Sequence, residues 1–450
     1  VQTVVIVVVW KEFNRAILLN VDIKNALNYA VILAFVISTI CVYLFARKYF
    51  GNKIGLLALL IINLTDYNIL WGSAPQTTTF GLTLYYFIIY SLSNTIEGVN
   101  AKEWILICIL FIVAMIFAHV VSSFILVTTI MLFLLGSLLY KILYNRAATL
   151  YCVYMLTVSV TALIGYWFNA MYRSYPIFDT LINQLAHSAS LYAGFLNRPE
   201  TYAEYAVTLP PLLERMVDMV GLSILAFFAA IGAFYLLTPR YRNKLNFTLV
   251  ICICIILTIT FGFPLFGIRN IIPDRWFGFA YFFLSIFGAF ALYQISKRIK
   301  RVYVMEAFVL IAIFMLSFFM ASSTISNTDS PLWLGESTIS NTYTIPEMQG
   351  ASTLSNHYHN ITSDGRYLEY VLMMYYGCEQ DVTEHELHIW RRYTLTRPVN
   401  IARELEGDYA SSYTKLKYQP TILGAGYQNN LLKKHCKVYD NPDISAFVIM

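Results

Sequence analysis

The sequence predicts an all-α polytopic membrane domain of about ten transmembrane helices, followed by a small extracytoplasmic α/β domain. Of the 450 residues, 58% are hydrophobic and 13% are charged, and the mean hydropathy is +0.60. Soluble domains average roughly 45–50% apolar and about 25% charged residues. The apolar excess lies between positions 26 and 320, where short basic loops separate long apolar stretches. We therefore expect a multi-span domain over 1–320 and a soluble domain over 321–450.

Ten apolar stretches are candidate spans, because a transmembrane helix needs about 20 mainly apolar residues. They are 27–45, 54–70, 77–93, 104–118, 120–140, 150–172, 212–237, 246–263, 276–295 and 303–320. The stretches 77–93 and 104–118 are short and carry polar ends. Residues 1–10 are apolar but too short to cross, so they are either the end of a truncated helix or a helix at the outer surface.

Basic loops orient these spans, because Lys and Arg collect on the cytoplasmic side of membrane proteins. The basic residues are Arg47, Lys48 and Lys53, then Lys141 and Arg146, then Arg240, Arg242 and Lys244, then Lys297, Arg298, Lys300 and Arg301. An even number of candidate spans separates each pair of loops, so one topology satisfies all four. It places His119, the long loop 173–211, the segment 263–275 and everything after 320 outside the cell membrane.

The long loop 173–211 and the tail after residue 320 both contain local structural signals. Apolar residues recur at helical spacing over 177–185 and predict an amphipathic helix on the membrane surface. In the tail, a helix-like run over 366–376 ends at Gly377, and a turn at 440–443 predicts a terminal β-hairpin. Cys378 and Cys436 are the only cysteines of the tail, and an outer location makes them a candidate disulfide, although sequence supplies no geometry.

Several functional classes are disfavoured. The net charge of +5 comes mostly from short loops between spans, so it indicates orientation and not binding to nucleic acid. The chain has no Walker-type GxxxxGK[ST], HExxH, GxSxG or CxxC pattern, which argues against an ATPase, a zinc protease and a serine hydrolase. The mid-membrane stretches carry almost no charge and no internal repeat is visible, which disfavours an energy-coupled transporter.

Ionisable residues near the outer span ends are the candidates for chemistry, since such residues are costly in a membrane. Asp66 lies about one turn inside the outer end of its span and is the candidate catalytic residue, as a base, a metal ligand or an acceptor for a substrate hydroxyl. The structural alternative is an interfacial carboxylate that is hydrated or bonded to Tyr67 or Asn68.

Arg269, Asp274 and Arg275 cluster before span 276–295 and are candidate substrate-binding residues, because the guanidinium fork recognises phosphate. Here the alternative is contact of Arg275 with lipid headgroups and Asp274 as a helix N-cap. His119, at the turn between two spans, is a further candidate for contact with a phosphate or a sugar, or is simply solvated.

The order of these parts resembles the C-type integral-membrane glycosyltransferases, in particular archaeal-type members. The segments that carry the resemblance are 42–52, 55–71, 118–123, 273–277, 362–366 with 375–377, and 437–441. It covers nearly the whole chain, although no single motif is strongly specific. It implies transfer of a sugar from a polyprenyl-phosphate-linked donor to a glycan, lipid or protein acceptor on the outer face, with Asp274 and Arg275 near the lipid phosphate.

The resemblance also implies an acidic motif in the first outer loop, which the chain lacks in the expected context. Only Glu12 and Asp22 precede residue 25, and the chain begins with Val1, so we expect an N-terminally truncated protein whose acidic centre lies upstream. The cofactor is open, with a divalent metal such as Mg²⁺ or Mn²⁺ as one option. The expected partners are the lipid-linked donor, membrane lipids and the acceptor. The alternatives are a non-catalytic protein that binds or scaffolds cell-surface glycans, and a transporter of lipid-linked sugars.

Overall fold

The structure is a computed structural model, and its elements fall into two compact units. It describes residues 23–73, 77–97, 101–144, 151–172, 175–176, 178–179, 216–265, 273–323, 325–326, 343–363, 367–378, 387–391, 399–404, 416–421 and 435–449. The helical unit comprises Val1–Leu196 and Met219–Ala321, and the carboxyl-terminal unit comprises Asn197–Asp218 and Ser322–Met450.

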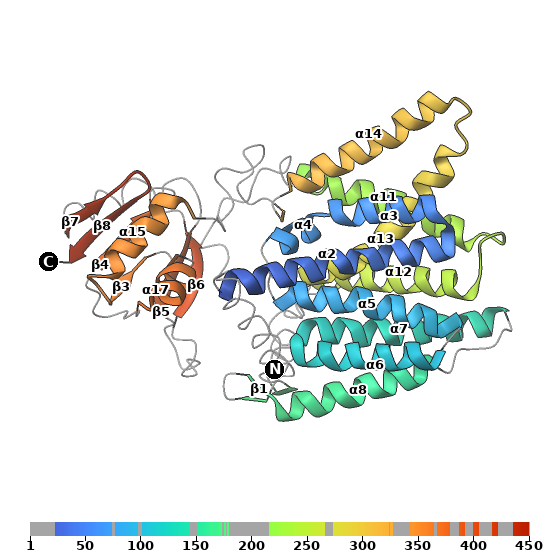
Figure 1. The fold of residues 1–450 in the computed structure, drawn as a ribbon, viewed down its shortest axis with the longest axis horizontal. Helices are drawn as coiled ribbons and strands as arrows, with labels where there is room; N and C mark the ends of the chain where they lie inside the picture. Colours follow the sequence, from blue (N-terminus) through green and yellow to red (C-terminus); the bar gives the residue numbers. More distant parts are fainter. Residues whose placement is uncertain are drawn as a thin grey trace. The chain divides into compact units, whose positions relative to one another are not determined.

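The helical unit is a bundle of long apolar helices (Figure 1). Its helices are α2 (Ile23–Phe50), α3 (Asn52–Leu64), α4 (Asp66–Ser73), α5 (Thr77–Glu97), α6 (Ala101–Ala118), α7 (Val120–Tyr144), α8 (Tyr151–Asn169), α11 (Val220–Leu237), α12 (Lys244–Leu265), α13 (Pro273–Ser296) and α14 (Val302–Ala321). The short strands β1 (Met171–Tyr172) and β2 (Tyr175–Pro176) pair antiparallel after α8. Each predicted span coincides with one of these helices or with the pair α3–α4.

Six described helices are long and apolar enough to cross a membrane, or seven spans result if α3 and α4 form one bent span. The expected number of about ten spans is not confirmed. α5 is rich in Thr, Ser and Tyr, α6 carries Lys102 and Glu103 in its first turn, and the apolar part of α8 is limited to Val153–Asn169. The expectation of one continuous helix over 54–70 also needs correction, because α3 and α4 meet at Thr65 with a bend of 64°.

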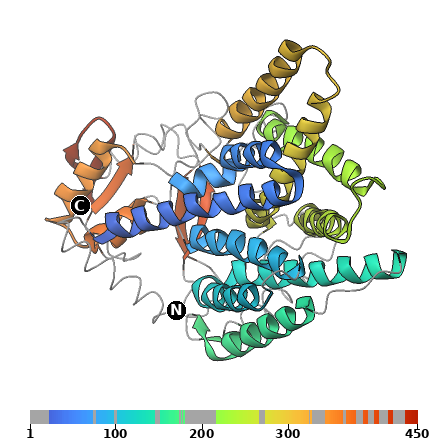
Figure 2. The ribbon, with the colours of Figure 1, turned by 45° about the vertical axis from the view of Figure 1, so that its right-hand side comes forward.

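α13 is the central helix of the bundle, and it packs against α11, α3 and α12 (Figures 1 and 2). Its apolar window is 89% buried within the protein, whereas that of α14 is 11% buried. Gly232 allows α11 to approach α13 closely, since a Cβ at this position would collide with the carbonyl oxygen of Phe287. Small residues permit such close backbone approach between membrane helices.

The predicted basic loops gather at one end of this bundle. The ring of Phe50 at the end of α2 lies 5.2 Å from that of Phe290 in α13. The guanidinium of Arg242 lies 4.4 Å from the ring of Tyr144 at the end of α7. The described parts of all four basic loops are thus at the same end, as the topology requires. The compartment that this end faces stays a prediction.

The carboxyl-terminal unit combines short helices with small sheets. Its elements are α15 (Ile345–Ser355), β3 (Ile361–Thr362), the π-helical turn η2 (Leu368–Met373), α17 (Met374–Tyr376), β4 (Leu387–Arg391), β5 (Val399–Glu404), β6 (Leu416–Thr421), β7 (His435–Asp440) and β8 (Ile444–Ile449). One sheet has the order β3-β4-β8-β7, with β3 parallel to β4 and the other pairs antiparallel, and β5 pairs with β6. The terminal β-hairpin is confirmed as β7–β8, and the predicted helical run corresponds to η2 and α17, ending at Gly377 with φ of 66°.

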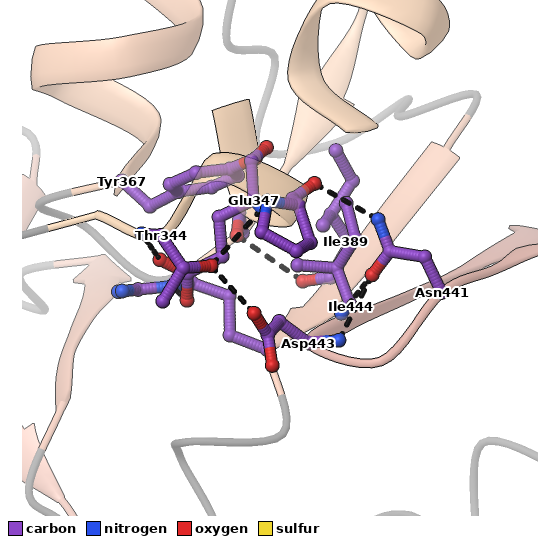
Figure 3. A network of polar contacts seen from close by, with 10 residues as sticks. Thr344, Glu347, Tyr367, Ile389, Asn441, Asp443 and Ile444 are labelled. Carbon is purple, nitrogen blue, oxygen red and sulfur yellow. Dashed lines mark hydrogen bonds and ion pairs between the residues drawn. The ribbon is translucent and has the colours of Figure 1, made fainter. Parts of the chain in front are cut away.

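A polar network holds α15 against the sheet of this unit (Figure 3). Thr344 and Glu347 form a capping box, because the Thr344 side chain accepts from the Glu347 amide while the Glu347 carboxylate accepts from the Thr344 amide. The second carboxylate oxygen of Glu347 accepts from Nε of Arg391 at 2.8 Å, and both side chains are almost fully buried. The Arg391 guanidinium lies 5.1 Å from the ring centroids of both Tyr343 and Tyr367.

The candidate disulfide between Cys378 and Cys436 is not formed. Cys378 is buried in the core beside Leu372, whose carbonyl accepts its amide hydrogen. Cys436 is an exposed residue of β7, an end strand of its sheet, and is paired in register with Val448. The pairing of β7 with β8 therefore fixes Cys436 on the sheet, while the helical turn before Cys378 directs the other thiol into the core.

We expect replacement of Gly232 by Ala to lower the stability of the helical unit by about 1–3 kcal/mol, because the added methyl group forces α11 away from α13. The midpoint of thermal unfolding in detergent measures this loss. Gly165→Ala in α8 is the matched control, since nothing lies within 4 Å of its added Cβ. Equal midpoints for the two variants would contradict close packing at Gly232.

We expect Glu347→Gln to destabilise the carboxyl-terminal unit by about 3–5 kcal/mol, because the buried Arg391 charge loses its partner while the helix cap is kept. Hydrogen exchange of α15 and β8 amides measures this local stability. Lys437→Gln is the control, as it removes the exposed Lys437–Asp440 pair, which we expect to contribute about 0–1 kcal/mol. Unchanged exchange in Glu347→Gln would contradict the role of the pair.

Candidate functional site

The break between α3 and α4 positions Asp66. Thr65 adopts an extended conformation with ψ of 142°, and its hydroxyl donates to the carbonyl of Ile62 at 2.8 Å. Asp66 then begins α4, where its Oδ1 accepts from the amide of Tyr67 at 2.7 Å. A carboxylate at a helix N-terminus is stabilised by the unpaired amides and by the helix dipole. The helix break thus gives Asp66 a local reason to be ionised.

Asp66 also forms a hydrogen bond with the central helix α13. Its side chain is buried, with 4% exposure, and its Oδ1 accepts a second hydrogen bond of 2.7 Å from the Tyr281 hydroxyl. A second contact lies beside it, where the Tyr86 hydroxyl donates to Oδ1 of Asn68 at 3.2 Å and to the carbonyl of Gly278 at 3.4 Å. α4, α5 and α13 are therefore joined by polar contacts inside the bundle.

Aromatic packing continues along the same half of α13. A Cβ at Gly278 would collide with the Trp71 ring of α4, so glycine is needed for this approach. The Phe277 ring lies 6.2 Å from that of Tyr67 and 5.3 Å from that of Phe261 in α12. Trp276 lies 6.0 Å from Phe124 in α7. Arg275, immediately before these residues, thus sits on a rigid helix start.

His119 occupies the turn between α6 and α7. The amide of Ser122 donates to its Nδ1 at 3.3 Å, and the Ser122 hydroxyl lies 2.7 Å from the same nitrogen. Because Nδ1 accepts hydrogen bonds, the neutral ring carries its proton on Nε2. The Ser123 hydroxyl closes the turn by donating to the carbonyls of Met115 and His119. A Cβ at Gly81 would collide with Ser122, so α5 packs directly on this turn.

The charge of Arg275 acts on His119, although 156 positions separate the two residues in the sequence. Burial is the larger cause and the positive charge of Arg275 the smaller one, and together they lower the pKa of His119 from 6.5 to about 4. The imidazole is therefore neutral at physiological pH. Within the described part of the chain, Arg275 forms no hydrogen bond or ion pair with another side chain. The site offers one guanidinium and one neutral N–H donor, which suits an anionic oxygen.

The side chains of two further predicted site residues lie outside the described part of the chain. Arg269 lies outside the described residues, as does the predicted surface helix apart from 178–179. Asp274 belongs to the first turn of α13, but its side chain is outside the described part. The roles of Asp66, Arg269, Asp274, Arg275 and His119 as catalytic or substrate-binding residues stay predictions.

Sequence reasoning missed Tyr86 and Tyr281, which hold Asn68 and Asp66. The chain has 34 tyrosines, and aromatic belts at the membrane interfaces account for tyrosine at span ends without any specific role. Both side chains are fully buried in the structure. The available signal was their position within apolar stretches and away from the ends, because a hydroxyl buried there needs a polar partner.

The described residues do not fit a metal centre. No group of three or more His, Cys, Asp or Glu side chains among them is arranged to hold an ion. Asp66 belongs to no such group in the described ranges, and one of its oxygens already accepts two hydrogen bonds.

We expect Arg275→Gln to raise the pKa of His119 toward its ordinary value, because a repulsive charge is removed while burial is kept. Histidine-selective NMR titration measures this, with His119→Gln assigning the resonance. In the wild type, His119 binds a proton less readily in the folded state than in the unfolded state. The free energy of unfolding should therefore fall as the pH drops from about 6.5 toward 4. An unchanged His119 pKa in Arg275→Gln would show that the two charges do not interact.

Comparisons with known proteins agree with the resemblance seen in the sequence. Residues 16–167 match the family described as dolichyl-phosphate-mannose-protein mannosyltransferase, a range that includes Asp66 and His119 but not Arg275. No curated protein sequence matches the chain.

Solved structures to which the chain is similar include those of the Archaeoglobus fulgidus oligosaccharyltransferase. The complex with Zn and sulfate has a TM-score of 0.49 and 14% identity, covering 84% of this chain and 49% of that one. The structure tethered with an acceptor peptide has a TM-score of 0.46 and 14% identity, covering 84% and 51%. The complex with an inhibitory peptide and a dolichol-phosphate has a TM-score of 0.44 and 14% identity, covering 84% and 52%. This chain thus spans about half the length of those proteins. The family match over 16–167 confirms the predicted resemblance to C-type membrane glycosyltransferases for that part of the chain.

Proposed function

We propose that this chain is the membrane part of a glycosyltransferase that takes a sugar from a polyprenyl-phosphate-linked donor on the outer face of the cell membrane. The family match over 16–167 is the observation that carries the proposal. The pair of His119 and Arg275 supports it, because both offer donors to an anionic group at one end of the bundle. The acceptor is a glycan, a lipid or a protein.

Arg275 and His119 bind the phosphate of the donor lipid in this proposal. When the bond between sugar and phosphate breaks, negative charge grows on the leaving phosphate oxygen. A fixed guanidinium stabilises that charge most effectively when its position is set beforehand. The packing of Trp276, Phe277 and Gly278 sets the position of Arg275. The proton on Nε2 of His119 adds a second donor, which stays in place because the imidazole is neutral at working pH.

The group that activates the acceptor lies outside the described part of the chain in this proposal. Asp66 was predicted as the catalytic residue, but its contacts favour a positioning role. Its side chain is buried, and Oδ1 accepts from both Tyr281 and the Tyr67 amide. A base needs an oxygen within hydrogen-bond reach of the proton that it removes. Through Tyr281, Asp66 instead anchors α4 to α13 two turns after Arg275.

The remaining parts take supporting roles. The carboxyl-terminal unit lies outside the cell and positions or selects the acceptor. The segment 177–185 guides the lipid chain at the membrane surface. In this proposal a divalent metal, where one takes part, is held by acidic residues outside the described part of the chain.

We expect Arg275→Gln in the full-length protein to lower sugar transfer roughly 100-fold, because one charged donor to the developing phosphate charge is lost. The measurement is transfer from labelled polyprenyl-phosphate sugars to endogenous acceptors in membranes. Arg301→Gln, which changes an exposed arginine after α13, is the control and should retain activity. Retained transfer in Arg275→Gln would contradict the role of Arg275.

The same experiment separates the alternatives. A glycan-binding scaffold would hold a glycan but transfer no sugar in the wild type. A transporter would move the intact lipid-linked sugar across the membrane without breaking a bond. If the wild-type protein transfers none of the supplied sugars, the proposed enzyme is wrong.

We expect Asp66→Ala and Tyr281→Phe to lower transfer by similar factors, with the double variant no worse than either, because each removes the same contact between α4 and α13. A matching loss in thermal midpoint should accompany both. A catalytic Asp66 would give another result, in which Asp66→Ala abolishes transfer while Tyr281→Phe keeps most of it.

A further inference from the structure

Two basic turns lie side by side at the end of the bundle that carries the basic loops. The turn between α11 and α12 contains Arg240, Tyr241 and Arg242, and the turn after α13 contains Lys297 and Arg298. Nε2 of Gln294 in α13 donates to the Tyr241 hydroxyl at 3.3 Å. Both turns are at the right-hand end of the bundle in Figure 1. They form one surface.

Each of four cations on this surface lies over a tyrosine ring. The distances from cation to ring centroid are 5.5 Å for Arg240 and Tyr241, 4.4 Å for Arg242 and Tyr144, 4.5 Å for Lys297 and Tyr293, and 5.4 Å for Arg298 and Tyr235. Cation–π contacts hold a cation in place without neutralising it. We call Arg240, Arg242, Lys297 and Arg298 the basic–tyrosine patch.

The patch carries uncompensated positive charge. None of its four cations forms an ion pair with a carboxylate among the described residues. Arg240, Lys297 and Arg298 are exposed and Arg242 is half-buried. The carboxyl ends of α11 and α13 offset part of the charge, by about half an elementary charge each. About three positive charges therefore remain for an external anion.

Apolar side chains are exposed immediately beside the patch. Phe234, in the last turn of α11, is 73% exposed, and Val302 and Tyr303, in the first turn of α14, are 62% and 64% exposed. Both helices are long and apolar enough to be membrane spans. The surface therefore combines an anion site at the ends of two spans with apolar flanks that suit acyl chains. A phospholipid has both chemical parts in this order.

We propose that the basic–tyrosine patch binds the headgroup of an anionic phospholipid, whose acyl chains pack on the exposed faces of α11 and α14. The phosphate and any further anionic group contact Arg242 and Arg298, which come from different turns and hold the headgroup between them. Binding fastens the α11–α12 turn to the end of α13. It does not depend on the proposed glycosyltransferase activity.

The test is the binding of phosphatidylglycerol to the purified full chain in detergent, followed by native mass spectrometry and by the thermal midpoint. Arg242→Gln/Arg298→Gln should lower its affinity roughly 20-fold, since each basic residue near an anionic headgroup contributes about a fivefold factor. The control is Lys53→Gln/Lys141→Gln, which removes the same charge from exposed lysines at the same end and should bind as the wild type does. Phosphatidylcholine should bind weakly to all three proteins.

Three results would overturn the proposal. Equal losses in the patch and control variants would mean that net charge, and not the patch, attracts the lipid. Unchanged binding in the patch variant would place the lipid elsewhere. Equal thermal protection by inorganic phosphate alone would identify a free-phosphate site, because the acyl chains would then contribute nothing.

Discussion

The close approach of other helices to α13 is the constraint on which the rest of the helical unit depends. Helices in a bilayer gain no hydrophobic free energy by associating, so they rely on van der Waals packing and interhelical hydrogen bonds. Gly232 lets α11 reach the α13 backbone, and Gly278 lets the Trp71 ring of α4 do so. With these contacts made, α13 is buried along almost its whole length, and Arg275 at its start has a defined position.

The break at Thr65 has a cost that neighbouring residues offset. A bent span exposes backbone groups, and each unsatisfied group in an apolar environment costs several kcal/mol. Here Thr65 and Asn68 side chains donate to the Ile62 carbonyl, and the Asp66 carboxylate accepts the Tyr67 amide. Tyr281 completes the arrangement from α13. The buried carboxylate therefore makes a bent helix possible, which explains its presence in an apolar stretch without invoking catalysis.

Composition and periodicity predicted the positions of the helices well, because apolar stretches of span length leave the backbone few alternatives in lipid. The four basic loops predicted which helix ends lie together, and contacts such as Arg242 with Tyr144 confirm this. The terminal hairpin also followed from its turn residues. The bend at Thr65 was not foreseen, since no Gly or Pro marks it. The predicted disulfide between Cys378 and Cys436 is not formed, because the pairing of β7 with β8 decides where Cys436 lies. An oxidising compartment would permit a disulfide but does not bring two thiols together.

The sequence by itself determined a helical bundle with its basic ends on one side, since hydropathy and charge act along the chain and need no partner. Only the tertiary structure decided that α13 is central while α14, which is the more apolar of the two, is exposed. It alone brought His119 within reach of the charge of Arg275, and Tyr281 to Asp66. These pairs lie far apart in sequence, and no local pattern records them. Their formation depends on which helix faces fit together, which is a property of packed surfaces and not of any one segment.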